Sequence, residues 1–289
     1  MRVTQSMLSH NMMKNIANSN AMLNTYMDQL STGKKINRPS DDPTVAMNGV
    51  NYRTQLTEIE QFQRNTNEVH TWMDNSDVAL NQATQSMQKL RELGIQASND
   101  TYGADERQNM KEEAEEIKAH LIDIANTKVN GKYIFNGTNT DVLPIDEDGN
   151  FSLSHDPVMI EVSGGTKLQA NVDPERVFNE ALFNDIDSFI DALEGNNQAA
   201  IEQSTESINE NITNTINARA DLGARMNRLE LIENRLSEQE IVANQTMSEN
   251  EDIDFAEVIT QLITQESVHR AALSAGSRII QPTLMDFLR

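Results

Sequence analysis

The sequence predicts a mainly α-helical protein with a small β-rich insertion, whose N- and C-terminal halves form a long antiparallel helical bundle or coiled coil. Three observations predict this fold. Apolar or small residues recur at steps of three and four along two long segments, which is the period of a helix packed along a partner. Aromatic residues make up only 4% of the 289 residues, which favours narrow helix seams over one thick core. The helical segments stand on both sides of a central stretch rich in turn signals, so the chain travels out and returns.

The first long helix is predicted from Thr44 to about Ser98. Asp42 is a natural N-cap, and Pro43 suits the first helical turn. At a rise of 1.5 Å per residue, about 55 residues make a rod of roughly 80 Å, which needs other helices alongside it to cover its apolar stripe. The residues expected to pack this rod and the helix that returns along it are Leu56, Phe62, Leu80, Leu90, Leu222, Met226, Leu229 and Leu236.

A second helix is predicted to begin with Asp105 and Glu106 in its first turn, where carboxylates favour the helix dipole. Its expected end is the pair Asn130 and Gly131, which suits a C-cap. After the insertion, a helix is expected to open at Asp173 and to run over 173–194. Two further helices are predicted over 197–247 and 254–284, because apolar residues recur there at helical spacing.

Residues 132–172 change character and form the predicted β-rich insertion. Tyr133–Phe135 and Val158–Val162 are short runs typical of strands, and Asp148-Gly149 suits a hairpin turn between apolar stretches. Gly164-Gly165 follows the second run and suits another turn. The insertion therefore interrupts two helical halves.

The charge and residue content exclude several classes of function. The net charge is −22 at pH 7, which argues against nucleic acid and anionic membrane surfaces as partners, because those need a basic protein surface. No cysteine is present, so disulfides, thiol catalysis and cysteine-based metal sites are excluded. The N-terminus lacks the apolar core of a signal peptide, and no apolar stretch is long enough to span a membrane.

Chemistry-bearing patterns are weak throughout the chain. The five histidines are scattered and show no paired spacing of the kind that a helical zinc site needs. The acidic run Asp146–Asn150 has its glycine at the wrong position for a calcium loop, and a hairpin turn explains it better. We therefore expect no catalytic residue, no cofactor and no metal site.

Both chain ends carry few charges but keep apolar periodicity, which predicts surface that becomes buried in an assembly. We expect a terminal helical assembly domain formed by 1–42 and 250–289, largely disordered in the free monomer. A helical rod domain is expected from 43–131 and 173–249, and a small β-rich outer domain from 132–172. The residues expected to take part in subunit assembly are Leu23, Leu30, Gly33, Arg38, Asp41, Asp42, Leu262, Leu273, Ile280 and Leu284.

Several motifs carry a resemblance to a known family. Residues 29–46 read QLSTGKKINRPSDDPTVA, residues 130–140 read NGKYIFNGTNT, and residues 218–230 read ARADLGARMNRLE. Together with the tail over 254–288, these resemble bacterial flagellins and flagellin-like hook-associated proteins. The stretch RPSDDP is similar to the hook–filament junction family, hook-associated protein 3, whereas flagellins more often have small residues at the two proline positions.

This resemblance implies a structural subunit of the bacterial flagellum, not an enzyme, that joins hook-associated proteins to the flagellin filament. It implies export by the flagellar type III apparatus without a cleaved signal peptide, and an extracellular location at the hook–filament junction. The implied partners are neighbouring copies of the chain, another hook-associated protein on the hook side, flagellin on the filament side and an export chaperone. A flagellin, the bulk filament subunit, is the alternative. An enzyme carried on the insertion is a third hypothesis, which lacks any visible pairing of nucleophile and base.

Overall fold

The computed structural model describes residues 5–99, 103–146 and 149–280. Contacts between residues group the chain into two compact units. The terminal unit comprises Met1–Glu58 and Gln239–Arg289, and the central unit comprises Ile59–Glu238. Two long helices, α2 (Pro43–Ala97) and α5 (Gln198–Glu251), contribute residues to both units.

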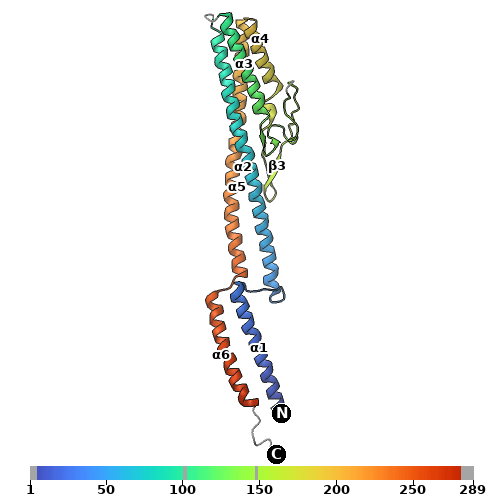
Figure 1. Cartoon of the computed structure of the whole chain (residues 1–289), viewed down its shortest axis with the longest axis vertical. Coiled ribbons are helices and arrows are strands. Elements are labelled where there is room, and N and C mark those ends of the chain that lie inside the picture. Colours follow the sequence, from blue (N-terminus) through green and yellow to red (C-terminus); the bar gives the residue numbers. More distant parts are fainter. Residues whose placement is uncertain (1–4, 100–102, 147–148, 281–289) are drawn as a thin grey trace, which may run out of the picture. The chain divides into compact units, whose positions relative to one another are not determined.

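The terminal unit contains α1 (Gln5–Thr32), the beginning of α2, the end of α5, and α6 (Phe255–Ile280). Helices α1 and α6 lie side by side in opposite directions (Figure 1). A loop follows α1 and leads into α2, and a short bend separates α5 from α6. A single β-bridge pairs Lys34 in that loop with Asp252 in the bend, so the two connections lie next to each other.

None of the helices within 5–99, 103–146 and 149–280 is both long and apolar enough to cross a membrane.

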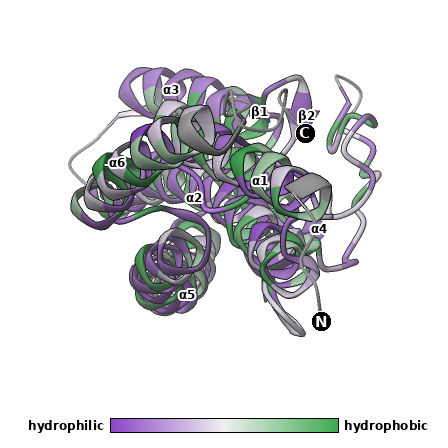
Figure 2. Cartoon of the chain, turned by 90° about the horizontal axis from the view of Figure 1, so that it is seen from below, coloured by the Kyte–Doolittle hydropathy of each residue, from purple (hydrophilic) through white to green (hydrophobic). Residues whose placement is uncertain are grey.

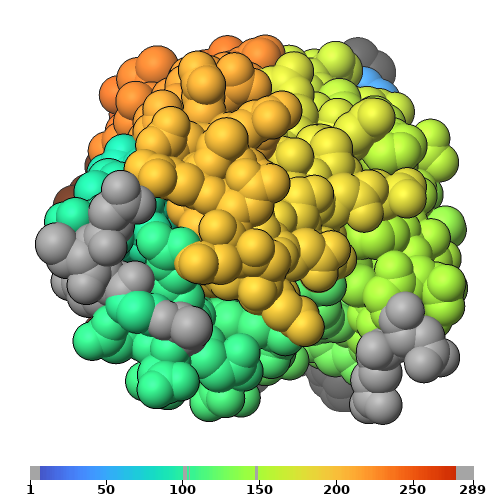
Figure 3. Space-filling view, turned by 90° about the horizontal axis from the view of Figure 1, so that it is seen from above, coloured from blue at the N-terminus to red at the C-terminus, as the bar shows by residue number. Residues whose placement is uncertain are grey.

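The central unit packs α3 (Ala104–Ala125) and α4 (Glu180–Glu194) with the inner parts of α2 and α5. Seen from above, α4 lies between α3 and the β segments (Figure 3). The guanidinium of Arg219 on α5 contacts the carboxylate of Asp77 on α2, with Nε 2.6 Å from Oδ1. This ion pair fixes how α2 and α5 align along each other, although Asp77 and Arg219 lie far apart in the sequence.

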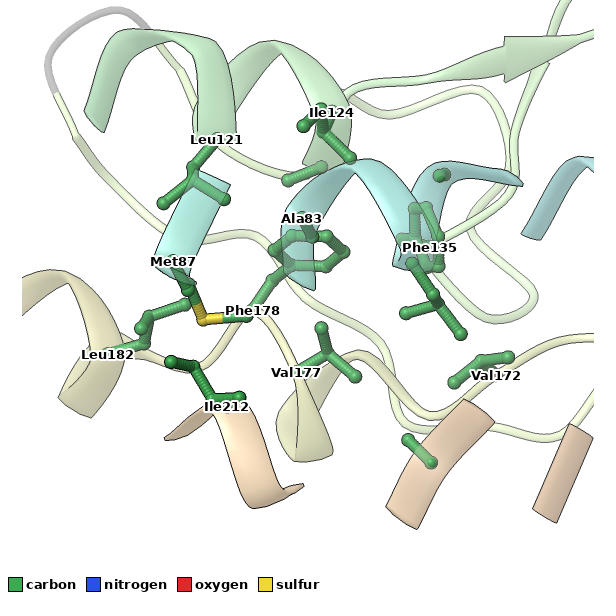
Figure 4. Close-up of a cluster of buried hydrophobic side chains, with 14 of the residues drawn as sticks. Ala83, Met87, Leu121, Ile124, Phe135, Val172, Val177, Phe178, Leu182 and Ile212 are labelled. Atoms are coloured by element: carbon green, nitrogen blue, oxygen red, sulfur yellow. The ribbon is translucent and has the colours of Figure 1, made fainter. Parts of the chain in front are cut away.

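The core of the central unit is formed by side chains from every one of its helices (Figure 4). The rings of Phe135 and Phe178 meet edge to face at 5.0 Å between centroids, a favoured arrangement for aromatic pairs. The neighbours that Figure 4 labels around them are Ala83, Met87, Leu121, Ile124, Val172, Val177, Leu182 and Ile212. This aromatic pair joins Phe135, after β2, to Phe178, which precedes α4.

The insertion contains two small antiparallel sheets of two strands each. One pairs β1 (Lys128–Val129) with β2 (Lys132–Tyr133), and the other pairs β3 (Met159–Ser163) with β4 (Thr166–Gln169). The second hairpin turns at Gly164-Gly165, as the sequence predicts. The predicted fold class, a helical bundle with a small β insertion, is confirmed.

The end of α3 corrects one expectation. The helix ends at Ala125 rather than at Asn130-Gly131, and this pair instead forms the turn between β1 and β2. Asn130 and Gly131 have φ angles of 53° and 81°. Two successive positive φ values match the hairpin turn whose twist suits flanking strands, so the dipeptide favours the hairpin over the helix cap.

The beginning of α4 corrects another. Asp173 caps only a single 3-10 turn, η1 (Pro174–Arg176), and α4 itself begins at Glu180. The side chain of Asn179 accepts a hydrogen bond of 2.7 Å from the backbone N–H of Leu182, which makes Asn179 the N-cap. Asp173 and Asn179 each cap the start of a helical segment. The sequence analysis predicted one helix from Asp173, whereas the chain forms a 3-10 turn and then α4.

The boundaries of the two long helices follow the sequence signals more closely. Asp42 Oδ1 accepts hydrogen bonds from the N–H groups of Thr44 and Val45, at 2.9 and 3.2 Å. The predicted N-cap of α2 is thus confirmed. Helix α5 continues to Glu251, a few residues beyond the predicted end.

Truncation of a buried residue in the central unit should lower stability more than truncation of an exposed one. We expect Leu80→Ala to lower the free energy of unfolding by about 2–5 kcal/mol, because Leu80 is fully buried and its loss leaves a cavity. The matched control is Leu231→Ala on α5, whose side chain is 71% exposed, and its effect should stay within about 0.5 kcal/mol. Urea unfolding followed by circular dichroism measures both, and equal losses would contradict the assigned core.

Candidate assembly surface

The contact between α1 and α6 is narrow. On α1, the covered positions follow one another at alternating steps of three and four, so that a single stripe of the helix faces its partner. These positions are Ser9, Met12, Ile16, Ser19, Leu23, Tyr26 and Leu30, and Gln29 beside Leu30 is also half-buried. The corresponding covered positions of α6 are Val258, Leu262, Gln265, His269, Ala272 and Gly276, and Gln261 beside Leu262 is also half-buried.

Small and polar residues occupy much of this stripe. Ser19 Oγ lies 3.1 Å from Gln265 Nε2 and 3.3 Å from His269 Nδ1. Gly276 lets the two helices approach closely, because a Cβ added there would lie 3.3 Å from the Cε atom of Met12. The α1–α6 pair therefore buries only a thin apolar strip.

Many large apolar side chains of the same two helices remain uncovered. Figure 2 shows hydrophobic stretches on both α1 and α6. We call these residues the terminal apolar surface: Met7, Leu8, Met13, Met22, Met27, Phe255, Ile259, Ile263, Val268 and Leu273. Scattered exposed apolar residues are normal on a protein surface, but ten on two helices make these helices a candidate contact surface.

The predicted assembly residues of the two helices fall into separate groups. Leu23, Leu30 and Leu262 are half-buried in the α1–α6 stripe. Leu273 is 48% exposed and belongs to the terminal apolar surface. Leu284 and the side chain of Ile280 lie outside the described residues.

The loop after α1 contains the other predicted assembly residues. Gly33 has a φ of +71°, and its N–H donates to the carbonyl of Gln29 at 2.8 Å, which closes the C-terminus of α1. Asp41 Oδ2 accepts from the backbone N–H of Arg38 at 2.9 Å and from that of Asn37 at 3.2 Å. The Arg38 side chain is exposed, so the carboxylate of Asp41 holds the loop, and the guanidinium of Arg38 stays available at the surface.

A buried carboxylate that the sequence analysis missed lies at the centre of these connections. Glu251, at the end of α5, is 4% exposed. Its Oε2 atom lies 2.6 Å from Nη2 of Arg53 on α2 and 3.4 Å from Nζ of Lys34. A Cβ added to Gly49 would lie 2.5 Å from Glu251 Oε1, so glycine leaves room for the carboxylate against α2.

Backbone hydrogen bonds complete this junction. The N–H of Lys35 donates to the carbonyl of Glu251 at 2.7 Å, and the N–H of Ile253 donates to the carbonyl of Gly33 at 3.1 Å. Lys34 Nζ also contacts Asp252 Oδ1 at 2.7 Å. We call Lys34, Arg53, Glu251 and Asp252 the ion cluster. A carboxylate near a helix C-terminus interacts unfavourably with the helix dipole. The position of Glu251 near the predicted helix end is therefore a sequence signal that it needs basic partners.

The predicted rod-packing residues are distributed over both units. Leu56 is half-buried in the terminal unit. In the central unit, Phe62 and Met226 pack half-buried against the core. The buried core residues of the predicted set are Leu80, Leu90, Leu222, Leu229 and Leu236.

The ion cluster should make the contact between the loop after α1 and the end of α5 sensitive to acid. A hydrogen bond from Lys34 holds the pKa of Asp252 below its usual value, and a hydrogen bond from Ser248 adds to this effect. A lowered pKa in the folded state contributes stability above the unfolded carboxyl pKa of about 3.9, and this contribution is lost as pH falls through the folded pKa. Asp252 is partly exposed, so we expect this contribution to the free energy of unfolding to be less than about 1 kcal/mol.

Amide hydrogen exchange of Ile253 in the full chain measures this effect. We expect Asp252→Asn to lower the exchange protection of the Ile253 amide at neutral pH. As the pH falls, this protection should change less in the variant than in the parent chain. The control is Asp28→Asn on α1, which should leave the protection of Ile253 unchanged because the Asp28 carboxylate has no ion pair within 5–99, 103–146 and 149–280. An unchanged acid profile in Asp252→Asn would rule out this role of the pair.

Comparison with known proteins agrees with the motifs. Residues 3–140 match the family model for the bacterial flagellin N-terminal helical region, and residues 205–288 match the model for its C-terminal helical region. The chain is 26% identical over 303 residues to flagellar hook-associated protein 3 of Escherichia coli K12, covering 95% of this chain and 96% of that protein. It is 28% identical over 300 residues to the protein of the same name from Salmonella typhimurium LT2, covering 94% and 95%.

The fold is also shared with a protein of known structure. A solved structure of a putative flagellar hook-associated protein from Vibrio parahaemolyticus matches with a TM-score of 0.69 at 21% identity, covering 73% of this chain and all of that one. The two flagellin regions together account for both helical halves of the chain. The chain therefore belongs to the bacterial flagellin family, and its similarity to flagellar hook-associated protein 3 extends over nearly its whole length.

Proposed function

We propose that this chain is a structural subunit of the bacterial flagellum, an adaptor that joins hook-associated proteins to the flagellin filament. The observation that carries this proposal is the terminal apolar surface, which α1 and α6 do not cover for each other. Full-length similarity to flagellar hook-associated protein 3 supports the junction rather than the filament as its place.

The energetics of the terminal unit favour assembly. Apolar surface contributes about 25 cal/mol for each Å² removed from water, and a helix of this length depends on tertiary burial for its stability. The α1–α6 stripe offers little of it, since Ser19 and Gln265 occupy central positions. Neighbouring subunits would bury the apolar surface that α1 and α6 leave exposed. Residues 1–42 and 250–289 would then become ordered during assembly, beginning next to the ion cluster.

The proposed partners follow from this arrangement. Neighbouring copies of the chain would cover part of the terminal apolar surface, with another hook-associated protein on the hook side and flagellin on the filament side. An export chaperone would cover the C-terminal helix before assembly, and export would use the flagellar type III apparatus without a cleaved signal peptide. The role is mechanical and extracellular, not enzymatic.

A flagellin, the bulk filament subunit, is the second candidate, because the matching family models are those of flagellin. The two functions differ in copy number, since a junction needs about one ring of subunits and a filament needs thousands. Purified protein that polymerised by itself into long filaments would favour flagellin.

Electron microscopy of a deletion strain tests the proposed function directly. We expect hooks to remain intact while flagellin is secreted without polymerising, because its attachment point is missing. The full gene should restore filaments, and a version lacking residues 254–289 should not, since it lacks α6. Normal filaments on the deletion strain would overturn the proposal.

A single substitution tests the terminal apolar surface. We expect Leu273→Asp to abolish incorporation into the junction, because a carboxylate without a partner is costly to bury between subunits. The matched control is Ser274→Asp, which adds the same charge at a neighbouring exposed position and should reduce incorporation less. Fractionation of sheared flagella, probed with antibody, measures both variants. Equal incorporation of Leu273→Asp and the parent chain would show that this residue makes no subunit contact.

A further inference from the structure

The β part of the central unit brings together three side chains that can bind a metal ion. His155 precedes β3, while Asp173 and Glu175 lie at the start of η1. One ligand atom from each residue lies within 4.8 Å of the other two. His155 lies 18 residues from Asp173, a spacing with no sequence signature, which is why the sequence analysis expected no metal site.

The distances suit a metal better than direct hydrogen bonds. His155 Nδ1 lies 3.5 Å from Asp173 Oδ1 and 3.6 Å from Glu175 Oε2. Both separations are at or beyond the limit of a hydrogen bond. Ligands about 2.0–2.1 Å from a tetrahedral zinc ion stand about 3.3 Å apart. The two distances from His155 Nδ1 are therefore within a few tenths of an ångström of this spacing, and all three ligand atoms lie within 4.8 Å of one another.

The two segments that carry these residues are already held in place. Asn171 Oδ1 accepts from the N–H of Val158 at 2.8 Å, which ties the segment between His155 and β3 to the segment before Asp173. Arg225 on α5 donates to the carbonyl of Asn171 at 2.9 Å. Asp173 Oδ1 accepts from the N–H of Glu175 at 3.1 Å. The site would therefore need little ordering of its backbone when an ion binds.

The local charges also favour a cation. Among the residues that the structure describes, His155 is the only basic side chain paired with Asp173 or Glu175. The nearby Arg176 pairs instead with Asp221, with Nη1 2.6 Å from Oδ2. A cavity of about 470 Å³ opens beside the cluster, and its charged and titratable lining residues are His155, Asp173, Asp221, Arg176 and Arg225. It leaves room for water molecules to complete the coordination of an ion.

We propose that His155, Asp173 and Glu175 form a site for a divalent transition-metal cation, with Zn²⁺ as the best match. An imidazole nitrogen with two carboxylates suits Zn²⁺ or Mn²⁺, whereas Mg²⁺ and Ca²⁺ prefer oxygen ligands alone. The ion would link the segment before β3 to the turn before α4, and so brace the β part against the helices. This proposal stands independently of the proposed function.

Isothermal titration of the untagged full chain with Zn²⁺ tests the site. We expect one ion to bind per chain, and His155→Ala and Glu175→Gln each to weaken binding by about tenfold or more. Both side chains are more than half exposed, so the variants should fold, and circular dichroism checks this. The matched control is His70→Ala on α2, whose imidazole Nδ1 lies 2.8 Å from Asp74 Oδ2. It should bind Zn²⁺ as tightly as the parent chain.

Four results would overturn the proposal. The parent chain could show no binding of Zn²⁺, or His155→Ala could bind as well as the parent. His70→Ala could also lose as much affinity as His155→Ala, which would indicate adsorption to surface histidines. Displacement of Zn²⁺ by equimolar Mg²⁺ would argue against the imidazole ligand and count against the proposal as well. Thermal unfolding with and without Zn²⁺ gives a second measurement, because an ion that binds only the folded chain raises the Tm.

Discussion

The terminal unit depends on one buried carboxylate. Glu251 joins the end of α5 to Arg53 on α2 and to Lys34 in the loop after α1. A buried charge without partners would be strongly destabilising, so these basic residues must stay in place. Because the bend into α6 follows directly, the same cluster determines where α1 and α6 begin to pair.

The two units differ in how completely they cover their apolar residues. In the central unit, four helices and the β segments enclose Phe135 and Phe178. In the terminal unit, two helices meet along a stripe that includes Ser19 and Gly276, and much of their apolar surface stays exposed. A unit with a closed core can fold alone, whereas one with a thin seam gains stability from neighbours. This difference suits the proposed role, in which the chain is exported and then assembled with neighbouring subunits.

Local signals predicted the helices well where a single cap decides the boundary. Asp42 begins α2 because its side chain meets the free N–H groups of the first turn. The signals misled where one dipeptide serves two structures, as Asn130-Gly131 does, since a positive φ suits both a C-cap and a hairpin. The choice between them depends on whether strands are available on both sides.

The helical period, the position of the insertion and the family could all be predicted from the sequence, because these depend on residues close together in the chain. The pairing of charges could not be predicted in this way and depends on the folded structure. Glu251 and Arg53 are 198 residues apart, and no local pattern pairs them. The same holds for His155 with Asp173, and for the choice of stripe along which α1 faces α6. Such contacts depend on how the helices and loops pack in space, and that packing follows from burial summed over the whole unit.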